Sequence, residues 1–323
     1  MKAIVVKEFG GSEVLKIEDL AVPEPCDHEV LISVHAVGVN PVETYIRSGS
    51  YGNLPKLPYT PGKDAAGVVE KVGAAVTRWK PGDRVYTANS ISGTYAQLTL
   101  CNEDDLGQLP FGIGFEAGAG IWTPYATSYR ALFQKVHAKA GETVLIHGAS
   151  GGVGIAAVQW AKHAGLMVIG TASSDIGREI VAAQGADLVF DHSKEGYLEA
   201  IRDMTDGQGV DVIVEMLANV NLQRDLEILK MFGRISIVGN RGSLDLNPRA
   251  IMRKDATVTG MALFNAPREA FDEIHAAIFD GLGKGYLNPI IDRIFPLTDA
   301  AAAHQAVIND RSKGKIVLIP SAP

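Results

Sequence analysis

The sequence predicts a two-domain α/β protein, in which a helix-covered parallel sheet interrupts a smaller domain rich in β-strands. Its first hundred residues read as short strands separated by turn residues. From Thr143 onward, apolar runs of strand length alternate with helical stretches, the pattern of a parallel sheet buried on both faces. The length of 323 residues agrees, because one compact core rarely serves so long a chain.

The early strands predict a partly closed antiparallel β-barrel. Strand-forming residues are concentrated in five segments with glycine or proline between them, and no helix of convincing length interrupts them. A strand-like segment at residues 315–320 has no helix after it and needs a sheet to join, so we expect it to join this barrel. The five segments are residues 1–7, 30–39, 66–73, 83–88 and 94–100.

The second part of the chain contains six strand-like runs, the number in a complete doubly wound dinucleotide-binding sheet. We expect residues 123–266 to form this domain, and residues 1–122 with 267–323 to form the barrel domain. Two further helices are predicted in the tail, at residues 269–282 and 299–310.

Composition excludes several classes of protein. Apolar residues make up 46% and charged residues 21%, which is ordinary for a folded globular chain. The formal charge of −7 argues against a protein that coats nucleic acid electrostatically. Only Cys26 and Cys101 occur, which we interpret as structural thiols because no disulfide framework or thiolate metal loop is possible. The N-terminus lacks the pattern of a signal peptide, so we expect the cytoplasm.

A glycine-rich segment, His147 to Gly154 (HGASGGVG), lies between a strand-like run and a helical run. Glycines at such a junction allow a tight turn and let a pyrophosphate approach the backbone, while the helix N-terminus offers unpaired N–H groups. A structural turn that binds nothing is the alternative. Within six alternating strand–helix units, the segment favours dinucleotide binding.

The end of the second strand of this sheet favours NADP over NAD. An acidic residue there would hold the ribose 2′-hydroxyl of NAD, but residues 171–174 read Thr-Ala-Ser-Ser. These small residues leave room for a 2′-phosphate and do not repel it. The nearest basic residue, Arg178, lies four positions beyond Ser174.

Several segments resemble the zeta-crystallin-like quinone oxidoreductases, a zinc-independent branch of the medium-chain dehydrogenase/reductase superfamily. Besides the glycine-rich segment, the similar stretches span the chain nearly end to end. They are GVNPVETYIRSGSY from Gly38, LPYTPGKDAAGVVEKVG from Leu57, PGDRV from Pro81, VEMLANVNL from Val214 and VGNRGSLDLNPR from Val238.

The resemblance implies a GroES-like catalytic domain with an inserted Rossmann domain, and NADPH-dependent reduction of quinones. Where related zinc enzymes carry a cysteine and a His-Glu pair, this sequence has Asn40 and Lys63-Asp64. These positions leave a catalytic zinc with too few ligands, so we expect no metal.

The resemblance also implies which residues bind the cofactor and the acceptor. Ser173 corresponds to the adenosine phosphate position, and Asn40 and Tyr51 are expected to contact the quinone. The implied cofactor contacts are Tyr45, Tyr51, Thr127, Ser150, Gly151, Gly152, Val153, Ser173, His192, Asn221, Val238, Gly239, Asn240, Arg241, Met261, Ala262 and Leu263.

Several of these residues have structural alternatives. From the residues alone, a solvated loop histidine is the favoured interpretation of His192, and only the resemblance favours a cofactor contact. Asn221 also reads as the N-cap of a helix that starts there. Leu263 reads as core packing, Thr127 as an ordinary helix residue, and the barrel tyrosines as half-buried side chains.

The leading functional hypothesis is an NADPH-dependent quinone reductase, in which Asn40 or Tyr51 donates a hydrogen bond to the acceptor. A reductase of activated alkenes such as enals or enoyl thioesters is the enzymatic alternative. A non-catalytic NADPH-binding crystallin or RNA-binding protein is the other, although the acidic charge disfavours RNA. We expect a homo-oligomer, dimer or tetramer, because the last parallel strand lies at the sheet's edge.

Overall fold

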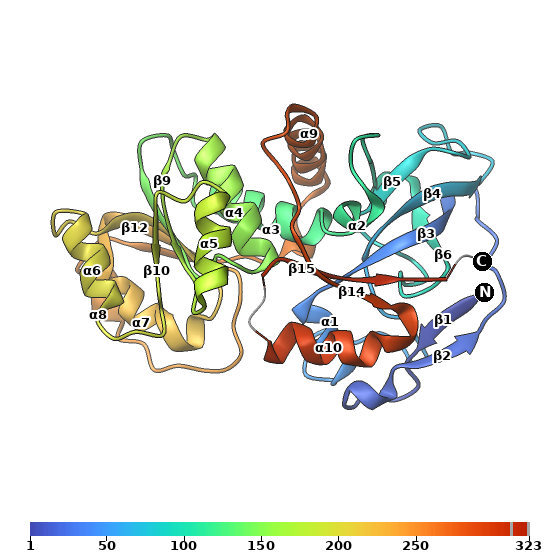
Figure 1. The fold of residues 1–323 in the computed structure, drawn as a ribbon, viewed down its shortest axis with the longest axis horizontal. Coiled ribbons are helices and arrows are strands. Elements are labelled where there is room, and N and C mark those ends of the chain that lie inside the picture. The colour runs from blue at the N-terminus through green and yellow to red at the C-terminus, as the bar shows by residue number, and fades with distance from the viewer. Residues whose placement is uncertain (311–312, 322–323) are drawn as a thin grey trace. The chain divides into compact units, whose positions relative to one another are not determined.

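The computed structural model describes residues 1–310 and 313–321 and divides into two compact units (Figure 1). Unit 1 comprises Met1–Thr123 and Asn288–Pro323, and unit 2 comprises Pro124–Leu287. The chain therefore leaves the first unit, builds the second and returns. The GroES-like and Rossmann architecture expected from the sequence is confirmed.

The second boundary differs from the prediction. Residues 267–287 were expected in the barrel domain, but they fall in unit 2. The reason is the packing of α9 (Arg268–Lys284), which unit 2 holds through aromatic residues. Tyr129 donates a hydrogen bond of 2.8 Å to Glu273, and the ring of Tyr286 stacks on His163 with centroids 3.4 Å apart.

Unit 1 is built on a seven-stranded, largely antiparallel sheet. Its order is β14-β15-β3-β4-β5-β7, and β6 pairs with β3 beside this path, while β1 and β2 form a separate pair. The strands are β1 Lys2–Val5, β2 Lys16–Asp19, β3 Glu29–Val39, β4 Asp64–Val72, β5 Arg84–Thr87, β6 Leu98–Asn102, β7 Leu106–Gln108, β14 Ile291–Pro296 and β15 Lys315–Ile319. The helices are α1 Pro41–Arg47, α2 Phe115–Gly118 and α10 Ala300–Asn309.

The terminal strand joins this sheet, as predicted. β15 runs antiparallel to β3, with Ile316 opposite Val39 and Leu318 opposite Val37. Figure 1 shows this late, red strand beside the early, blue one. The pairing brings the last part of the chain next to the end of β3, where Asn40 lies.

The expectation that no helix interrupts the early strands was wrong at one place. Helix α1 follows β3 directly, with Asn40 as its N-cap and Pro41 at its first position. The backbone N–H of Asn40 donates to Oε2 of Glu43 at 2.8 Å, which is half of a capping box. Asn-Pro followed by Glu is a helix-start signal that the turn-rich reading passed over.

Unit 2 is a doubly wound parallel sheet of six strands, as predicted, and the strand order is β10-β9-β8-β11-β12-β13. Its strands are β8 Thr143–Ile146, β9 Met167–Thr171, β10 Leu188–Phe190, β11 Val210–Glu215, β12 Leu229–Ile237 and β13 Thr257–Gly260. Its helices are α3 Thr127–Tyr129, α4 Gly152–His163, α5 Asp175–Ala183, α6 Tyr197–Met204, α7 Ala218–Ile228, α8 Pro248–Met252 and α9. π-Helical turns at Trp122–Ala126 and Arg130–Lys135 flank α3.

The core of unit 2 explains why these apolar segments form strands and helices. Leu145 and Ile213 of the central strands pack in one buried cluster with Ile201 of α6 and Leu222 of α7. The strands are buried along their lengths because helices cover them, so they carry apolar residues rather than an alternating pattern. Among the described residues, no helix is both long and apolar enough to cross a membrane.

Candidate functional site

The glycine turn after β8 has a backbone that only small residues allow. Gly148 has φ of +56°, in the left-handed region. A Cβ on Gly154 would lie 2.4 Å from the carbonyl oxygen of Gly148 and 2.5 Å from Cα of Ala149. Gly154 therefore lets the first turn of α4 lie against the loop before it.

The start of α4 is open for an anion. Its N-cap is Gly151, and among the described residues no side chain caps the helix. The first-turn N–H groups of a helix have no intrahelical partner, and they carry the positive end of the helix dipole. Ser150, Gly151, Gly152 and Val153 lie together in this turn and are all half-buried, as an anion-binding backbone requires.

Thr171, at the end of β9, connects the glycine turn to the loop after β10. Its hydroxyl accepts from the N–H of Gly148 at 3.2 Å and lies 3.3 Å from Nδ1 of His192. Its carbonyl accepts from the N–H of Ala149 at 2.8 Å. The structure thus brings His192 to the same edge of the sheet as the glycine turn, although the imidazole itself is exposed.

The end of β9 holds a guanidinium as well as small hydroxyl residues. Ser173 is half-buried, and Oγ of Ser174 accepts from the N–H of Gly177 at 3.1 Å as the N-cap of α5. Arg178 lies one turn further and pairs with Asp191 at 3.0 Å and with Asp175. Arg178 is four positions beyond Ser174 in the sequence, but the helical turn returns its side chain toward Ala172, whose carbonyl oxygen lies 3.5 Å from Nη1.

The loops after β11 and β12 are joined by reciprocal hydrogen bonds. The backbone N–H of Asn219 donates to Oδ1 of Asn240 at 3.0 Å, and the N–H of Arg241 donates to Oδ1 of Asn219 at 2.9 Å. A Cβ on Gly239 would meet the carbonyl oxygen of Met216 at 2.2 Å. These contacts place the segment from Val238 to Arg241 beside the start of α7.

Asn221 is not the N-cap of its helix, so that structural alternative was wrong. α7 begins at Ala218, and Asn221 lies inside its first turns. Its amide instead donates to Oε1 of Glu215 at 3.1 Å, and the N–H of Leu217 donates to the same oxygen. Glu215, at the end of β11, therefore orients the side chain that the resemblance assigned to the cofactor.

The remaining expected cofactor contacts of unit 2 differ in exposure. Met261 is half-buried after β13, and Ala262 beside it is exposed. Leu263 is buried in the 3₁₀ turn that follows, in agreement with packing. Thr127 is buried at the start of α3.

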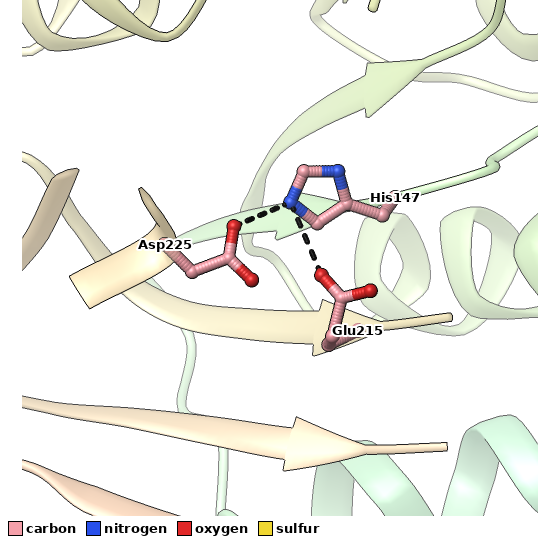
Figure 2. Close-up of side chains that lie close together, drawn as sticks. All are labelled: His147, Glu215 and Asp225. Carbon is pink, nitrogen blue, oxygen red and sulfur yellow. Dashed lines mark hydrogen bonds and ion pairs between the residues drawn. The ribbon is translucent and has the colours of Figure 1, made fainter. Parts of the chain in front are cut away.

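A buried cluster of His147, Glu215 and Asp225 lies beneath these loops (Figure 2). Nε2 of His147 lies 2.8 Å from Oδ1 of Asp225 and 3.5 Å from Oε2 of Glu215. Burial is the main cause that raises the pKa of Glu215 to about 8 and that of Asp225 to about 7, and burial also lowers the pKa of His147. At neutral pH the cluster therefore retains a carboxyl proton.

These three side chains offer ligand atoms within 4.8 Å of one another, as a metal site would. The spacing nevertheless suits a hydrogen bond better. Two ligand atoms at tetrahedral zinc lie roughly 3.3 Å apart, given metal–ligand distances of about 2.0 Å. The 2.8 Å between Nε2 of His147 and Oδ1 of Asp225 is shorter and is that of N–H···O.

Unit 1 contains a second buried polar cluster, at the positions where a catalytic zinc was judged impossible. Nζ of Lys315, on β15, donates to Asn40 Oδ1 and to Asp64 Oδ2, the latter at 3.0 Å. Nδ2 of Asn40 donates to Asp64 Oδ2 at 3.0 Å, and the hydroxyl of Thr123 donates to Asp64 Oδ1 at 2.6 Å. A buried ammonium, 251 residues along the chain from Asp64, thus supplies the positive charge here.

This geometry changes the part we expected Asn40 to play. Its second amide hydrogen faces Oε1 of Glu43 at 3.4 Å, and the side chain is buried. Both ends of the amide are therefore engaged within the protein. Asn40 and Tyr51 were the two residues expected to donate a hydrogen bond to the quinone. Of these, Tyr51 is the exposed one, at 40%.

The polar cluster continues into the interior of unit 1. The hydroxyl of Tyr95 donates to Oε2 of Glu43 at 2.9 Å and lies 3.0 Å from Nε2 of His304 on α10. Burial raises the pKa of Glu43 to about 7 and lowers that of His304 to about 3. His304 is therefore neutral at physiological pH. Tyr45, on the same helix as Glu43, is half-buried.

Sequence reasoning missed Glu215, Asp225, Lys315 and Glu43. Each lies far along the chain from a partner that gives it a role, and the sequence does not show which residue that partner is. Glu215 in the apolar run 210–217 and Lys315 in the apolar run 315–320 indicate only that a partner exists, because a charged residue in a buried strand requires one.

Comparison with known proteins agrees with this architecture. The model of the alcohol dehydrogenase GroES-like domain matches residues 26–149, and that of the zinc-binding dehydrogenase family matches residues 152–280. A human quinone oxidoreductase is 48% identical over 321 residues, covering 99% of this chain and 98% of its own. The chain belongs to the quinone oxidoreductase family of the medium-chain dehydrogenase/reductase superfamily.

Two other relatives bear on the chemistry. The Escherichia coli quinone oxidoreductase, solved in complex with NADPH, is 31% identical, with a TM-score of 0.92 and coverage of 99% of this chain and 100% of its own. A 2-haloacrylate reductase of Burkholderia sp. is 32% identical over 330 residues, covering 99% of both chains. One fold therefore includes proteins named for quinones and for an activated alkene.

Proposed function

We propose that this protein is an enzyme that reduces quinones with NADPH. The observation that carries the proposal is the arrangement at the carboxyl edge of the unit 2 sheet. There the uncapped start of α4 lies close to residues 173–178, which we call the Ser173–Arg178 corner. A Cβ on Gly177 would lie 3.4 Å from Cβ of Ser150, just before α4. The full-length identity of 48% to a quinone oxidoreductase supports the choice of acceptor.

Unit 2 would hold the dinucleotide through backbone and side-chain groups. The N–H groups from Ser150 to Val153 would bind the pyrophosphate, and Ser173 with Arg178 would bind the 2′-phosphate. His192 would contact the adenine side. The loops after β11, β12 and β13 would hold the nicotinamide end through Asn221, the segment 238–241 and Met261–Leu263, and Thr127 would lie beside that ring.

When bound, NADPH supplies the hydride, and the protein supplies orientation and charge stabilisation. The resemblance assigns Tyr45 and Tyr51 to the cofactor and Tyr51 also to the acceptor, and the Tyr51 hydroxyl would donate to an acceptor oxygen. Asn40 would support this site rather than donate to the acceptor, because Lys315, Asp64 and Glu43 already engage its amide.

A reductase of activated alkenes is the second candidate, and the Burkholderia 2-haloacrylate reductase favours it. Hydride transfer to either acceptor requires an electron-poor carbon or ring and the same cofactor arrangement. The two functions therefore differ only in the acceptor pocket.

The test is NADPH consumption against a panel of quinones and a panel of 2-haloacrylates and enals. We expect kcat/KM to be highest for a quinone. In Tyr51→Phe we expect it to fall up to roughly tenfold, the value of one neutral hydrogen bond of about 0.5–1.5 kcal/mol. Higher kcat/KM for an alkene would support the second candidate, and unchanged kinetics in both Tyr51→Phe and Tyr51→Ala would remove this residue from the site.

A further inference from the structure

Beneath the nucleotide loops of unit 2, three buried titratable side chains are left without a role in the proposed reaction. They are His147, Glu215 and Asp225, and their side chains are 4%, 0% and 0% exposed. Figure 2 shows both carboxylates turned toward the same ring nitrogen of His147. Each comes from a different element: the end of β8, the end of β11 and helix α7.

The cluster has fewer hydrogen-bond donors than buried carboxylate oxygens that need one. Nε2 of His147 lies 2.8 Å from Oδ1 of Asp225, and this contact uses one hydrogen. Oε2 of Glu215 and Oδ2 of Asp225 are both buried and have no hydrogen-bond partner among the described residues. Two adjacent buried carboxylates cannot both be ionised at acceptable cost, so one proton must lie on the pair.

The same three residues hold the elements that form the nucleotide site. His147 immediately precedes Gly148 of the glycine turn. Oε1 of Glu215 accepts from Asn221 at 3.1 Å and from the N–H of Leu217. The carbonyl of Glu215 accepts from the N–H groups of Val238 and Gly239 at 2.8 and 3.2 Å.

We propose that Glu215 and Asp225 are positioning residues for the dinucleotide, which act by sharing one proton beside His147. With the proton in place, Glu215 keeps Asn221 and the loops after β11 and β12 in the arrangement that binds NADPH. Loss of the proton leaves two buried negative charges side by side, which pushes α7 away from β11 and loosens these loops. This inference rests on the proposed binding of NADPH by unit 2.

The surrounding charges agree with a single retained proton. Arg224, on α7, is the cation whose charge acts on the cluster, and its guanidinium lies over the ring of Tyr197 of α6 at 5.4 Å from the ring centroid. Burial is the main cause that raises the pKa of the Tyr197 hydroxyl to about 12, so this group stays neutral. One nearby cation stabilises one carboxylate of the pair, and the second carboxyl keeps its proton.

The variant Glu215→Gln removes the ability to ionise and keeps the shape and the hydrogen-bonding atoms of the side chain. Its carbonyl can still accept from Leu217 and Asn221, and its amide can donate to Asp225 as a protonated acid does. It cannot ionise. Glu227→Gln is the matched control, because Glu227 is an exposed carboxyl on α7, the helix that carries Asp225.

The experiment is a fluorescence titration of NADPH between pH 7 and 9.5, above the second pKa of about 6 that a phosphate shows. Ligand-free thermal unfolding is measured over the same range. In the wild type and Glu227→Gln, we expect the affinity to fall at least fivefold across this range, together with the unfolding temperature. In Glu215→Gln the affinity for NADPH should change less than twofold across this pH range. Its unfolding temperature should shift by less than half as much as that of the wild type.

An affinity in the wild type that is independent of pH would overturn the shared proton, as would a Glu215→Gln protein that weakens as the wild type does. Stoichiometric metal bound by the wild type and lost in Glu215→Gln would overturn it too. If the wild type binds no NADPH at any pH, the proposed function fails. The unfolding data alone then decide whether the proton exists, and a pH-independent difference between wild type and Glu215→Gln would exclude it.

Discussion

Buried charged residues in both units pair with side chains from distant parts of the chain. Lys315 meets Asp64 and Asn40 because β15 pairs with β3 beside α1. From the sequence, Asn40 and Lys63-Asp64 could be seen to leave zinc too few ligands, but the ammonium of Lys315 beside Asn40 and Asp64 could not be foreseen. A lysine in an apolar strand shows that a partner exists and does not show which residue it is.

Removal of the Lys315 charge should destabilise the protein. In Lys315→Met, Asp64 is left buried without its cation, and we expect a loss of about 3–5 kcal/mol in the free energy of unfolding. The double variant Lys315→Met/Asp64→Asn should recover part of this loss, since no uncompensated charge remains. Denaturant unfolding measures both.

The matched control is Lys284→Met, which breaks an exposed pair with Asp280 of 2.8 Å. We expect the loss of stability there to be a small fraction of that at Lys315, because solvent screens an exposed pair. Equal losses of unfolding free energy in Lys315→Met and Lys284→Met would mean that burial does not make the Lys315–Asp64 pair more important for stability than an exposed pair.

At the scale of elements, the strands were predicted more reliably than the boundaries between helix and strand. All five early segments contain strands, whereas the short β2 and β7 were not predicted. The helix expected to start at Asn221 begins at Ala218 instead and ends at Ile228, directly before β12. Apolar periodicity alone does not separate the end of a buried helix from a buried strand. The glycine turn was correctly placed because its residues carry a local backbone requirement.

That requirement gives a test at Gly154. Its Cβ would lie 2.4 Å from the carbonyl oxygen of Gly148, so Gly154→Ala must shift the glycine turn or α4. We expect a loss of about 1–3 kcal/mol in unfolding free energy, the usual range for overpacking. NADPH binding should weaken too, because the turn supplies the phosphate-binding N–H groups.

Gly283→Ala is the corresponding control. Gly283 lies in α9, and a Cβ there meets nothing within 4 Å. We expect this change to stabilise the protein by up to about 1 kcal/mol, because alanine restricts the unfolded chain and favours helix. If Gly154→Ala behaved like Gly283→Ala, the close approach at the glycine turn would be refuted.

At the scale of the whole molecule, we predicted that the chain passes from unit 1 to unit 2 and back. The return to unit 1 was placed about twenty residues too early. The pattern of α9 identifies a helix and does not say which unit buries it. That choice depends on Tyr129, His163 and Tyr286, whose contacts are tertiary. The class of the protein was accessible because its motifs extend over nearly the entire chain.

Assembly is the other prediction at this scale. β13 lies at the end of the parallel sheet, and among the described residues it pairs with β12 alone. An open sheet edge favours pairing with a second copy across a two-fold axis. Light scattering at micromolar concentration should give the mass of a dimer or tetramer, against 34.3 kDa for one chain. A mass of one chain would contradict this.

The measurement that tests the central claim most directly is a paired titration of wild type and Ser173→Asp with NADPH and NADH. We expect the wild type to bind NADPH at least roughly tenfold more tightly, since a charge-assisted hydrogen bond to phosphate contributes about 1.5–3 kcal/mol. Ser173→Asp should abolish that preference through like-charge repulsion and leave NADH binding within about twofold, within the scatter expected of a surface change. Equal affinities of the wild type for the two cofactors, or a Ser173→Asp protein that still prefers NADPH, would contradict the assignment of the Ser173–Arg178 corner to the 2′-phosphate.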